Sequence, residues 1–490
     1  MHAVPDLLSR RAELSGDAVA LEEIATGRTL TYAQLHRRAG QAAALLAARG
    51  IGEGDRVAIL CRNRVAFFEL LFACARLRAI LVPLNWRMPQ AELDTLIADC
   101  APALLFHGRE DGGKAGGVPA IDLDADYEGL VAAAEPMPVR ASWPADGIWY
   151  LLYTSGTTGR PKGVIYTHRM ALANHVNIGT AIDLASSDTT LNFLPLFHTA
   201  GINLYSLPTL FQGGRVLILP GFDADAVVDV LEARRIDTFF AVPTVYQTLL
   251  DRPRFARAPL GHVRHWGCGG APLAEATARR ARAAGIRVCA GMGMTETGPT
   301  AFLASPDAAW ERPGSVGKPQ LLVGARVVGE DGRELADGAV GELQFSGPGV
   351  TPGYWNDPEA TRAAFTPDGW LRSGDLARRD ADGFWTICGR RKEMFISGGE
   401  NVYPAEVEKV LAAHPAVAEA AVVAAPHPHW GEVGRAFLQL AAGRAQPASA
   451  ELDAFCRTRL APYKVPTSFH YVADFPRTAA GKVQKHLLPL

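Results

Sequence analysis

A run of eleven residues, YTSGTTGRPKG at positions 153–163, gathers hydroxyl groups, glycines and two cations. Glycine lets the backbone approach an anion closely, hydroxyl groups donate hydrogen bonds, and lysine supplies positive charge. The run therefore predicts a phosphate-binding loop, with a solvated turn as the other interpretation. The residues that would hold the phosphates are Thr154, Ser155, Gly156, Thr157, Thr158 and Lys162.

The loop does not have the spacing of a nucleotide P-loop, in which four residues separate the first glycine from a Gly-Lys-Ser/Thr triplet. Counted from Gly156, Pro161 stands where the second glycine is required. β-Branched and aromatic residues flank the run at 149–153 and 164–168, and such residues favour strands. A strand–loop–strand hairpin that holds phosphate at its tip is therefore predicted.

Two carboxylates stand in short polar runs further along the chain. Thr295 and Glu296 lie in the glycine-bounded run GMGMTETGP (291–299), and Asp375 ends the run WLRSGD (370–375). Taken singly, Glu296 could be a helix cap or a surface carboxylate, and Asp375 an ordinary turn residue. Each of these runs is a weak signal by itself, so their occurrence together has to decide between the interpretations.

Two cationic runs follow in the last hundred residues. GRRKEMFISGGENVYPAEVE (389–408) places arginine, lysine and two adjacent glycines before a helical pattern. PRTAAGKVQK (476–485) places Lys482 directly after a glycine. A solvated tail lysine is the favoured interpretation for Lys485 but not for Lys482.

Together these runs resemble the signature of the adenylate-forming (AMP-binding) superfamily, and the chain resembles its acyl-CoA synthetase branch from about Thr31 to Lys485. The resemblance implies that a carboxylic acid is joined to AMP from ATP, with release of pyrophosphate. The acyl group then passes to the thiol of CoA. The first step is an in-line displacement at a phosphate, so it depends mainly on positioning and charge stabilisation.

The resemblance also assigns roles at the nucleotide. The loop would close over the β- and γ-phosphates, and Thr295 would contact the α-phosphate. Glu296 would bind Mg²⁺, a hard cation that prefers oxygen ligands. Asp375 would accept hydrogen bonds from the ribose hydroxyl groups, with help from Arg390. Lys482 would be the catalytic lysine that bridges the attacking carboxylate and the α-phosphate.

A mobile lid is the next implication of the resemblance. Lys392 matches the hinge position, about which the small domain would turn to withdraw Lys482. The turn would bring a second set of residues to the pantetheine channel of CoA, namely Ser397, Gly398, Gly399 and Trp430.

The adenine site follows the family with one departure. The loop Gly270, Ala271 and Pro272 matches the wall of that site. Met292 stands where relatives usually carry an aromatic residue that stacks on adenine. A thioether is polarisable and can cover a purine face, so we expect a weaker stack.

The acid is less well determined by the sequence. His198, in PLFHTAG (195–201), matches the gate of the acyl pocket. The expected neighbours carry no Arg or Lys, which disfavours a dicarboxylic acid because an unpaired buried charge is costly. They are Phe197, Ile202, Asn203, Val242, Thr244, Tyr246, Met292 and Met294. A fatty acid and a hydroxycinnamate-type aromatic acid both fit, with Asn203 or Tyr246 able to reach a ring hydroxyl. Loading of a carrier protein in place of CoA is the alternative function.

Composition limits the classes of protein. The 490 residues are 48% hydrophobic and 20% charged, with a net charge of −2, so no basic surface for nucleic acid is expected. Seven scattered cysteines without CxxC spacing indicate reduced thiols. The N-terminus lacks a signal pattern, and the apolar run 69–84 is too short to span a bilayer. We expect a cytoplasmic protein without stable membrane insertion; a homodimer remains open.

Alternating helix and strand patterns in the first half, such as a helix at 31–49 and a strand at 56–60, predict parallel sheets covered by helices. Hairpin signals dominate 317–387. The expected fold is an α/β protein with a large N-terminal domain (1–389) of two doubly wound subdomains and a distorted β-barrel, followed by a small mobile α+β domain (390–490).

Overall fold

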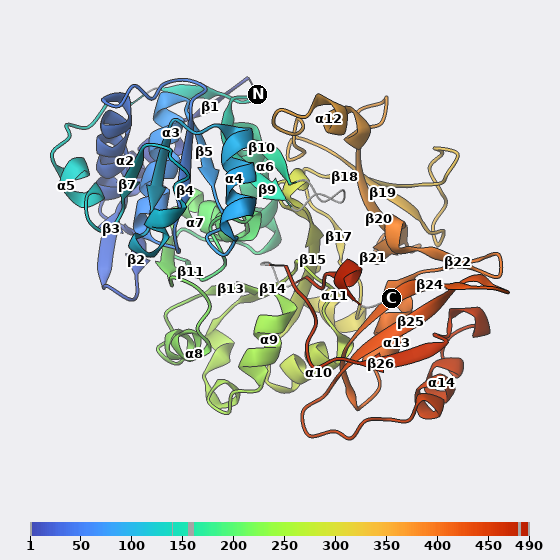
Figure 1. Ribbon diagram of the computed structural model, residues 1–490. Coiled ribbons are helices and arrows are strands. Elements are labelled where there is room, and N and C mark those ends of the chain that lie inside the picture. Colours follow the sequence, from blue (N-terminus) through green and yellow to red (C-terminus); the bar gives the residue numbers. More distant parts are fainter. Residues whose placement is uncertain (1, 140, 155–160, 479–481, 489–490) are drawn as a thin grey trace.

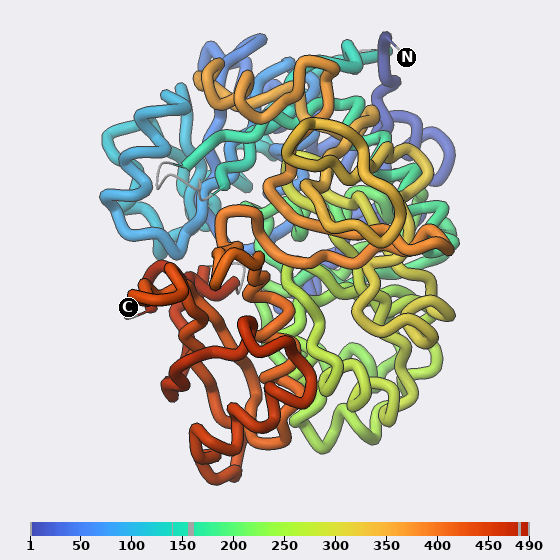
Figure 2. The backbone as a smooth tube through the Cα atoms, turned by 90° about the vertical axis from the view of Figure 1, so that its right-hand side faces the viewer, coloured from blue at the N-terminus to red at the C-terminus, as the bar shows by residue number. Residues whose placement is uncertain are grey.

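The computed structural model describes residues 2–139, 141–154, 161–478 and 482–488. The chain forms four units that largely follow one another in sequence, except that β2 (Val19–Glu23) and β3 (Arg28–Thr31) join the second unit (Figure 1). Two layered α/β units come first, a unit of antiparallel strands follows, and a smaller α+β unit ends the chain. A view of the molecule turned by 90° shows the last unit lying against the rest of the chain (Figure 2).

The first unit is built on a six-stranded sheet with the order β10-β9-β5-β4-β6-β7. All neighbouring strands are parallel except β9 and β10, which form an antiparallel hairpin. The strands are β4 (Arg56–Leu60), β5 (Ile80–Pro83), β6 (Leu104–His107), β7 (Ala120–Asp122), β9 (Ile148–Thr154) and β10 (Lys162–Thr167). The helices are α1 (Leu7–Ser15), α2 (Tyr32–Ala47), α3 (Val65–Leu77), α4 (Gln90–Cys100) and α5 (Tyr127–Ala132), and β1 (Ala3–Pro5) pairs with β8 (Ser142–Pro144).

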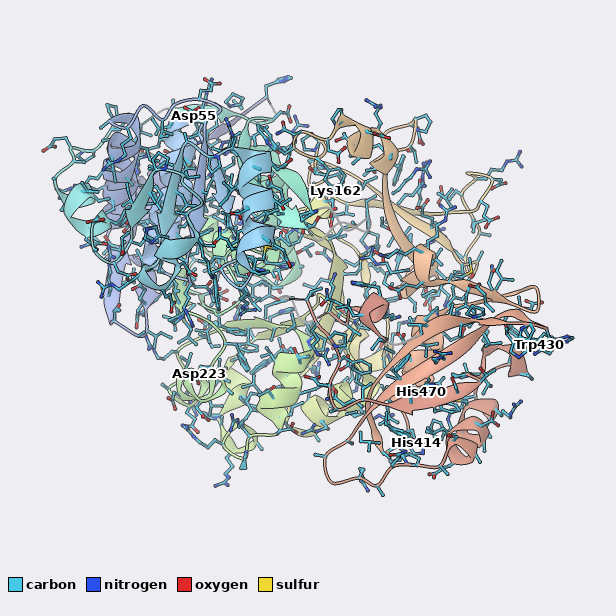
Figure 3. The ribbon with its side chains drawn as sticks, viewed as in Figure 1. Asp55, Lys162, Asp223, His414, Trp430 and His470 are labelled. Atoms are coloured by element: carbon cyan, nitrogen blue, oxygen red, sulfur yellow. The ribbon has the colours of Figure 1, made fainter. Side chains whose placement is uncertain are left out.

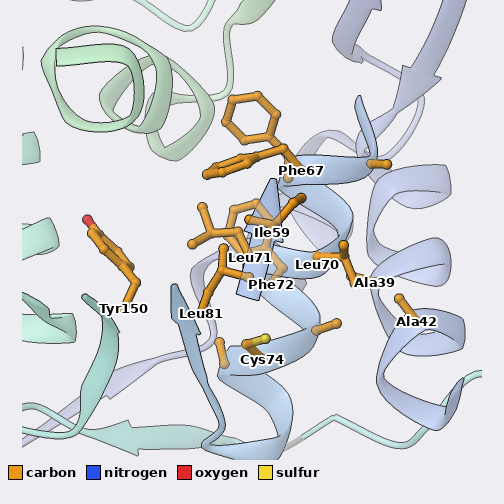
Figure 4. Packing of buried hydrophobic residues seen from close by; sticks show 14 of the residues in the cluster. Ala39, Ala42, Ile59, Phe67, Leu70, Leu71, Phe72, Cys74, Leu81 and Tyr150 are labelled. Carbon is orange, nitrogen blue, oxygen red and sulfur yellow. The ribbon is translucent and has the colours of Figure 1, made fainter. Parts of the chain in front are cut away.

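Local sequence explains the first two long helices. Thr31 caps α2, and its side chain and that of Gln34 satisfy each other's backbone amides in a capping box. Every residue of α3 is buried, which fits its almost wholly apolar sequence. Figure 4 shows α3 packed between α2 and the sheet, with Leu71 and Phe72 among the buried side chains.

The second unit is a nine-stranded sheet with the order β17-β16-β15-β14-β13-β11-β12-β2-β3. Its strands from β15 to β2 are parallel, and the edge strands are antiparallel. They are β2 (Val19–Glu23), β3 (Arg28–Thr31), β11 (Thr189–Asn192), β12 (Arg215–Ile218), β13 (Thr238–Ala241), β14 (His265–Cys268), β15 (Val288–Gly293), β16 (Thr300–Leu303) and β17 (Lys318–Pro319). The helices are α6 (His168–Ala181), α7 (Ser206–Gln212), α8 (Ala224–Glu232), α9 (Pro243–Leu250), α10 (Glu275–Ala283) and α11 (Pro306–Glu311).

The last two units are smaller. The region expected to form a distorted barrel is a four-stranded antiparallel sheet of β18 (Gly324–Val328), β19 (Gly341–Ser346), β20 (Leu371–Arg379) and β21 (Trp385–Arg390), with α12 (Pro358–Ala364). The final unit contains β22 (Phe395–Ser397), β23 (Glu400–Val402), β24 (Val417–His427), β25 (Gly431–Leu440) and β26 (Ser468–Tyr471), with α13 (Pro404–Ala412) and α14 (Ser449–Arg457).

The predicted fold class is confirmed: a large α/β portion is followed by a small α+β unit. The boundary at residue 389/390 and the hinge at Lys392 stay predictions. All seven cysteines are free, and Cys388 alone among them is only partly buried. Within the described ranges, no helix has the length and apolar character needed to cross a membrane.

Candidate active site

The predicted phosphate loop joins β9 to β10, as the flanking residues indicate. Thr154 ends β9, and Lys162 begins β10 opposite it in the antiparallel register. Figure 3 labels Lys162 near the centre of the molecule, where the units meet. Ser155, Gly156, Thr157 and Thr158 lie outside the described residues. The described strand ends, Thr154 and Lys162, therefore lie opposite each other on neighbouring strands.

Thr295 and Glu296 are buried in a single 3₁₀ turn that directly follows β15 and Met294. The Tyr354 hydroxyl donates a hydrogen bond to Glu296 Oε1 at 3.0 Å. The Lys162 ammonium lies 5.1 Å from the centre of the Tyr354 ring. Tyr354 thus connects the phosphate loop with the candidate metal ligand, a link that no motif in the sequence had indicated.

Asp375 and Arg390 occupy paired positions on β20 and β21, where Arg390 Nε lies 2.8 Å from Asp375 Oδ1. Burial raises the pKa of Asp375, while the charges of Arg390 and Lys482 oppose that rise. A buried carboxylate beside two cations remains able to accept hydrogen bonds from a diol.

Lys482, near the C-terminal end of the chain, lies within the electrostatic influence of these residues. The residue is exposed, yet desolvation by the surrounding protein lowers the pKa of its ammonium, as does the charge of Arg390. Asp375 and Glu296 act in the opposite direction. The distant segments that carry Asp375, Glu296 and Lys482 are therefore brought together in one electrostatic site.

His198 faces the same site from the segment after β11. Burial and, to a smaller extent, the charge of Lys482 lower its pKa to about 4. Its Nδ1 accepts a hydrogen bond from the Ala200 amide at 3.2 Å. The imidazole is therefore neutral near pH 7 and suits an uncharged gate beside an acyl group.

The predicted adenine wall follows β14 as an exposed loop that contains Gly270, Ala271 and Pro272. Gly270 has φ +84°, a backbone conformation that glycine adopts readily. Met292, on the neighbouring strand β15, is half-buried. A Cβ on the neighbouring Gly293 would lie 1.7 Å from the carbonyl oxygen of Pro299, so the chain can make this close turn only with glycine.

These residues fit ATP and Mg²⁺. Thr295 offers a hydroxyl group, and Asp375 a buried carboxylate. Among the described residues, no cluster of three or more His, Cys, Asp or Glu side chains could hold a metal ion. A site with one carboxylate, Glu296, suits Mg²⁺, which is commonly bound by one or two carboxylates together with substrate phosphates.

The residues predicted to meet CoA lie elsewhere. Lys392 is exposed just after β21. Ser397 is buried at the end of β22, and Gly398 and Gly399 form the exposed turn to β23, with φ of +60° and +88°. The 49% exposed Trp430 contacts Gly398 and lies at the outer edge of the last unit, far from Lys162 in Figure 3.

Two expected pocket residues do not have the predicted role. Asn203 accepts a hydrogen bond from the Tyr150 hydroxyl at 2.6 Å and donates one to Thr199, in the core. The fully buried Tyr246 donates its hydroxyl to the carbonyl of Gly267 at 2.9 Å. The expectation that Asn203 or Tyr246 reaches a ring hydroxyl is wrong, because internal partners already occupy these polar groups.

Two other side chains fill the space beside β14 instead. Phe240 packs over Gly267 and Gly269, where added Cβ atoms would lie 2.7 Å from Phe240 Cδ2 and 3.2 Å from its Cζ. Tyr205 packs on the same strand, and its hydroxyl is 2.8 Å from Nδ1 of His265. The glycines could be read from the sequence, but the side chains that cover them could not.

Lys485 also differs from its prediction. Its ammonium lies 2.6 Å from Glu393 and 2.7 Å from Glu408, and the side chain is 19% exposed. The interpretation of Lys485 as a solvated tail lysine is therefore wrong.

The chain matches two family models, "AMP-binding enzyme" over residues 8–355 and "AMP-binding enzyme C-terminal domain" over residues 406–482. It is 41% identical over 476 residues to a feruloyl-CoA synthase from Amycolatopsis sp, which covers 97% of this chain and 96% of that protein.

Solved structures give the same result. ATP-bound MatB from Rhodopseudomonas palustris matches with a TM-score of 0.91 and 34% identity, covering 99% of this chain and 98% of that chain. The apo form of MatB gives 0.83. MenE from Bacillus subtilis in complex with ATP and a magnesium ion gives 0.89 at 33% identity, with 99% of both chains covered. The overall match is therefore higher to the ATP-bound than to the apo form of MatB.

The central site, the two family models and the full-length matches lead to one assignment. The chain belongs to the AMP-binding enzyme family, as an AMP-forming acid–thiol ligase of the acyl-CoA synthetase branch that uses ATP, Mg²⁺ and CoA.

Proposed function

We propose that Lys482, Asp375, Glu296 and His198 form the centre in which the acid is adenylated. The observation that carries this proposal is the mutual electrostatic influence of Lys482, Asp375 and Glu296, which come from three distant segments. A lysine within the electrostatic influence of two carboxylates at a nucleotide site supplies the positive charge that two approaching anions require.

In this mechanism the chain binds, orients and supplies charge. Asp375 accepts hydrogen bonds from the ribose, and Thr295 donates one to the α-phosphate. Mg²⁺ bound at Glu296 would neutralise phosphate charge. Lys482 holds the attacking carboxylate against the α-phosphate, and neutral His198 borders the acyl group. The acid oxygen forms a bond to the α-phosphorus while the bond to pyrophosphate breaks.

We further propose that the acid is a compact aromatic monocarboxylic acid of hydroxycinnamate type. Two observations support this choice over a long fatty acid. Tyr205 and Phe240 pack closely against Gly267 and Gly269 on β14, and we infer that these bulky side chains limit the depth of the acyl pocket. The similarity to a feruloyl-CoA synthase points to the same class of acid.

A panel of carboxylic acids tests this proposal. AMP formation is measured with and without CoA for short to long fatty acids, benzoates and cinnamates. We expect the highest CoA-dependent turnover with a cinnamate. Preference for long fatty acids would contradict the acid class. AMP or pyrophosphate release without a CoA thioester would favour the carrier-protein alternative. The variant Phe240→Ala should extend the range toward longer acids.

For the second step we propose that the small domain turns at Lys392, which would bring Ser397, Gly398, Gly399 and Trp430 to CoA. The exposed position of Lys392 just after β21 is compatible with a hinge. Lys392→Pro fixes the backbone there and should slow at least one half-reaction. If both half-reactions kept their rates, the hinge assignment would be wrong.

A cytoplasmic location and a homodimer belong to the same proposal. The substrates ATP and CoA support the location, which cell fractionation tests. Light scattering coupled to size-exclusion chromatography tests the homodimer, and a mass of one chain would contradict it.

A further inference from the structure

The segment that carries Lys482 is held as two short arms, 476–478 and 482–485. The Thr478 amide donates to the Lys482 carbonyl at 2.8 Å, and the Gln484 amide donates to the Pro476 carbonyl at 2.8 Å. Arg477 and Val483 form an antiparallel bridge between the arms. The backbone position of Lys482 is therefore set by whatever anchors these arms.

The first arm and the middle of the second are anchored to the sheet of the last unit. Arg477 forms an ion pair with Glu419 on β24 through both of its terminal nitrogens. Val483 packs against an apolar cluster that includes Ala421 and Phe437. Leu488, just beyond the second arm, is buried in the same cluster, so these contacts hold the arms against the sheet.

Lys485 also anchors the second arm. Its ammonium lies between Glu393 Oε2 at 2.6 Å and Glu408 Oε1 at 2.7 Å. Burial opposes its charge, but the attraction of Glu408 and Glu393 is larger and raises its pKa. Glu408 also accepts the Val422 amide at 2.7 Å, so this carboxylate joins α13, β24 and the second arm.

One of these partners leads directly to the nucleotide site. Glu393 lies three residues after Arg390, which forms the ion pair with Asp375. The Asp375–Arg390 ion pair, the backbone from Arg390 to Glu393 and the Glu393–Lys485 ion pair therefore connect the nucleotide site to the second arm. Lys482 lies three residues before Lys485 on the same arm.

We propose that Lys485 is a positioning residue for acid adenylation, which acts through Lys482 by fixing its arm to Glu393 and Glu408. This inference rests on the proposed role of Lys482. Because a displacement of about 1 Å can cost about 100-fold in rate, loss of this anchor should be visible in the first half-reaction.

The test compares four variants: Lys485→Met, Lys485→Arg, Lys482→Met and the control Lys464→Met. Lys464 forms a comparable pair with Glu406 on α13 at 2.7 Å, but it does not hold the arm. Acid-dependent exchange of pyrophosphate into ATP measures adenylation, using the best acid of the panel. Thioester formation from the synthetic acyl-AMP and CoA measures the second half-reaction. Thermal unfolding is followed for each variant.

We expect Lys485→Met to slow the exchange by about 100-fold and to leave thioester formation from acyl-AMP unchanged. Lys485→Arg keeps the positive charge and should restore most of the exchange. Lys464→Met should lose stability to a similar degree without slowing the exchange. In Lys485→Met the pH at which the exchange rate declines on the alkaline side should also shift, because the surroundings of Lys482 change.

Three outcomes would overturn the inference. They are equal exchange rates in Lys485→Met and Lys464→Met, an equal loss in both half-reactions of Lys485→Met, and no rescue by arginine. If Lys485→Met does not fold, Glu393→Gln removes the more exposed partner and must give the same selective loss. Normal exchange in Lys482→Met would instead refute the proposed role of Lys482, so the two failures are distinguishable.

Discussion

Asp375 and Arg390 face each other across β20 and β21, with 2.8 Å between Asp375 Oδ1 and Arg390 Nε. This pair stands at the end of the last strand before the small unit, and Lys482 acts on the same carboxylate. The nucleotide site and the small unit are therefore coupled through one buried charge.

Arg390→Met should make ATP binding more sensitive to acid. Burial raises the pKa of Asp375, and Arg390 counteracts this rise. Removal of Arg390 raises the pKa further, so the carboxylate becomes protonated at a higher pH and stops accepting hydrogen bonds from the ribose. The KM for ATP, measured against pH, should begin to increase at a higher pH than in the wild type. An unchanged profile would show that Asp375 does not bind ATP as a carboxylate.

The alkaline limb of adenylation should report Lys482. Desolvation and Arg390 lower the pKa of this lysine from 10.5, so its charge is lost at a lower pH than that of an ordinary lysine. As the pH is raised, the rate of pyrophosphate exchange should therefore begin to decrease before the pH reaches 10.5. Lys482→Arg should remove this limb because arginine stays protonated. Lys482→Met should cost about 100- to 1,000-fold in rate, and a persistent limb in either variant would assign it to another group.

Tyr354→Phe should weaken Mg²⁺ binding in the presence of ATP. The Tyr354 hydroxyl donates to Glu296 at 3.0 Å, and hydrogen bonds to charged groups contribute about 1.5–3 kcal/mol. Without this donor Glu296 is less well oriented, so more Mg²⁺ should be needed for half-maximal ATP binding. Calorimetric titration measures this directly. Tyr471→Phe is the control, because its hydroxyl donates to Pro447 in the small unit; equal effects would refute the assignment.

Gly398→Ala should slow thioester formation more than adenylation. Gly398 has φ +60°, which costs other residues about 1–2 kcal/mol. A Cβ there would also lie 2.8 Å from the Trp430 ring. The substitution should therefore displace a loop that we assign to CoA, while leaving the ion pairs that anchor the arm of Lys482 in place. Single-turnover rates of the two half-reactions decide the matter: a selective loss of adenylation would contradict the proposed role of the loop.

The sequence by itself determined the elements and the chemistry of the separate motifs. Periodicity and capping predicted α2 and β4 close to their observed bounds, because local backbone preferences and apolar patterning decide such elements. The motif residues Glu296, Asp375 and Lys482 could likewise be named, since each lies in a short run of distinctive composition.

Tertiary structure alone decided which side chains meet. The hydrogen bond of Tyr354 to Glu296 and the two ion pairs of Lys485 join residues 58, 92 and 77 positions apart. The same packing turned Asn203 and Tyr246 into core residues and placed Phe240 over the glycines of β14. No local pattern encodes such contacts, because they arise only when distant segments share one buried, low-dielectric space in which every polar group requires a partner.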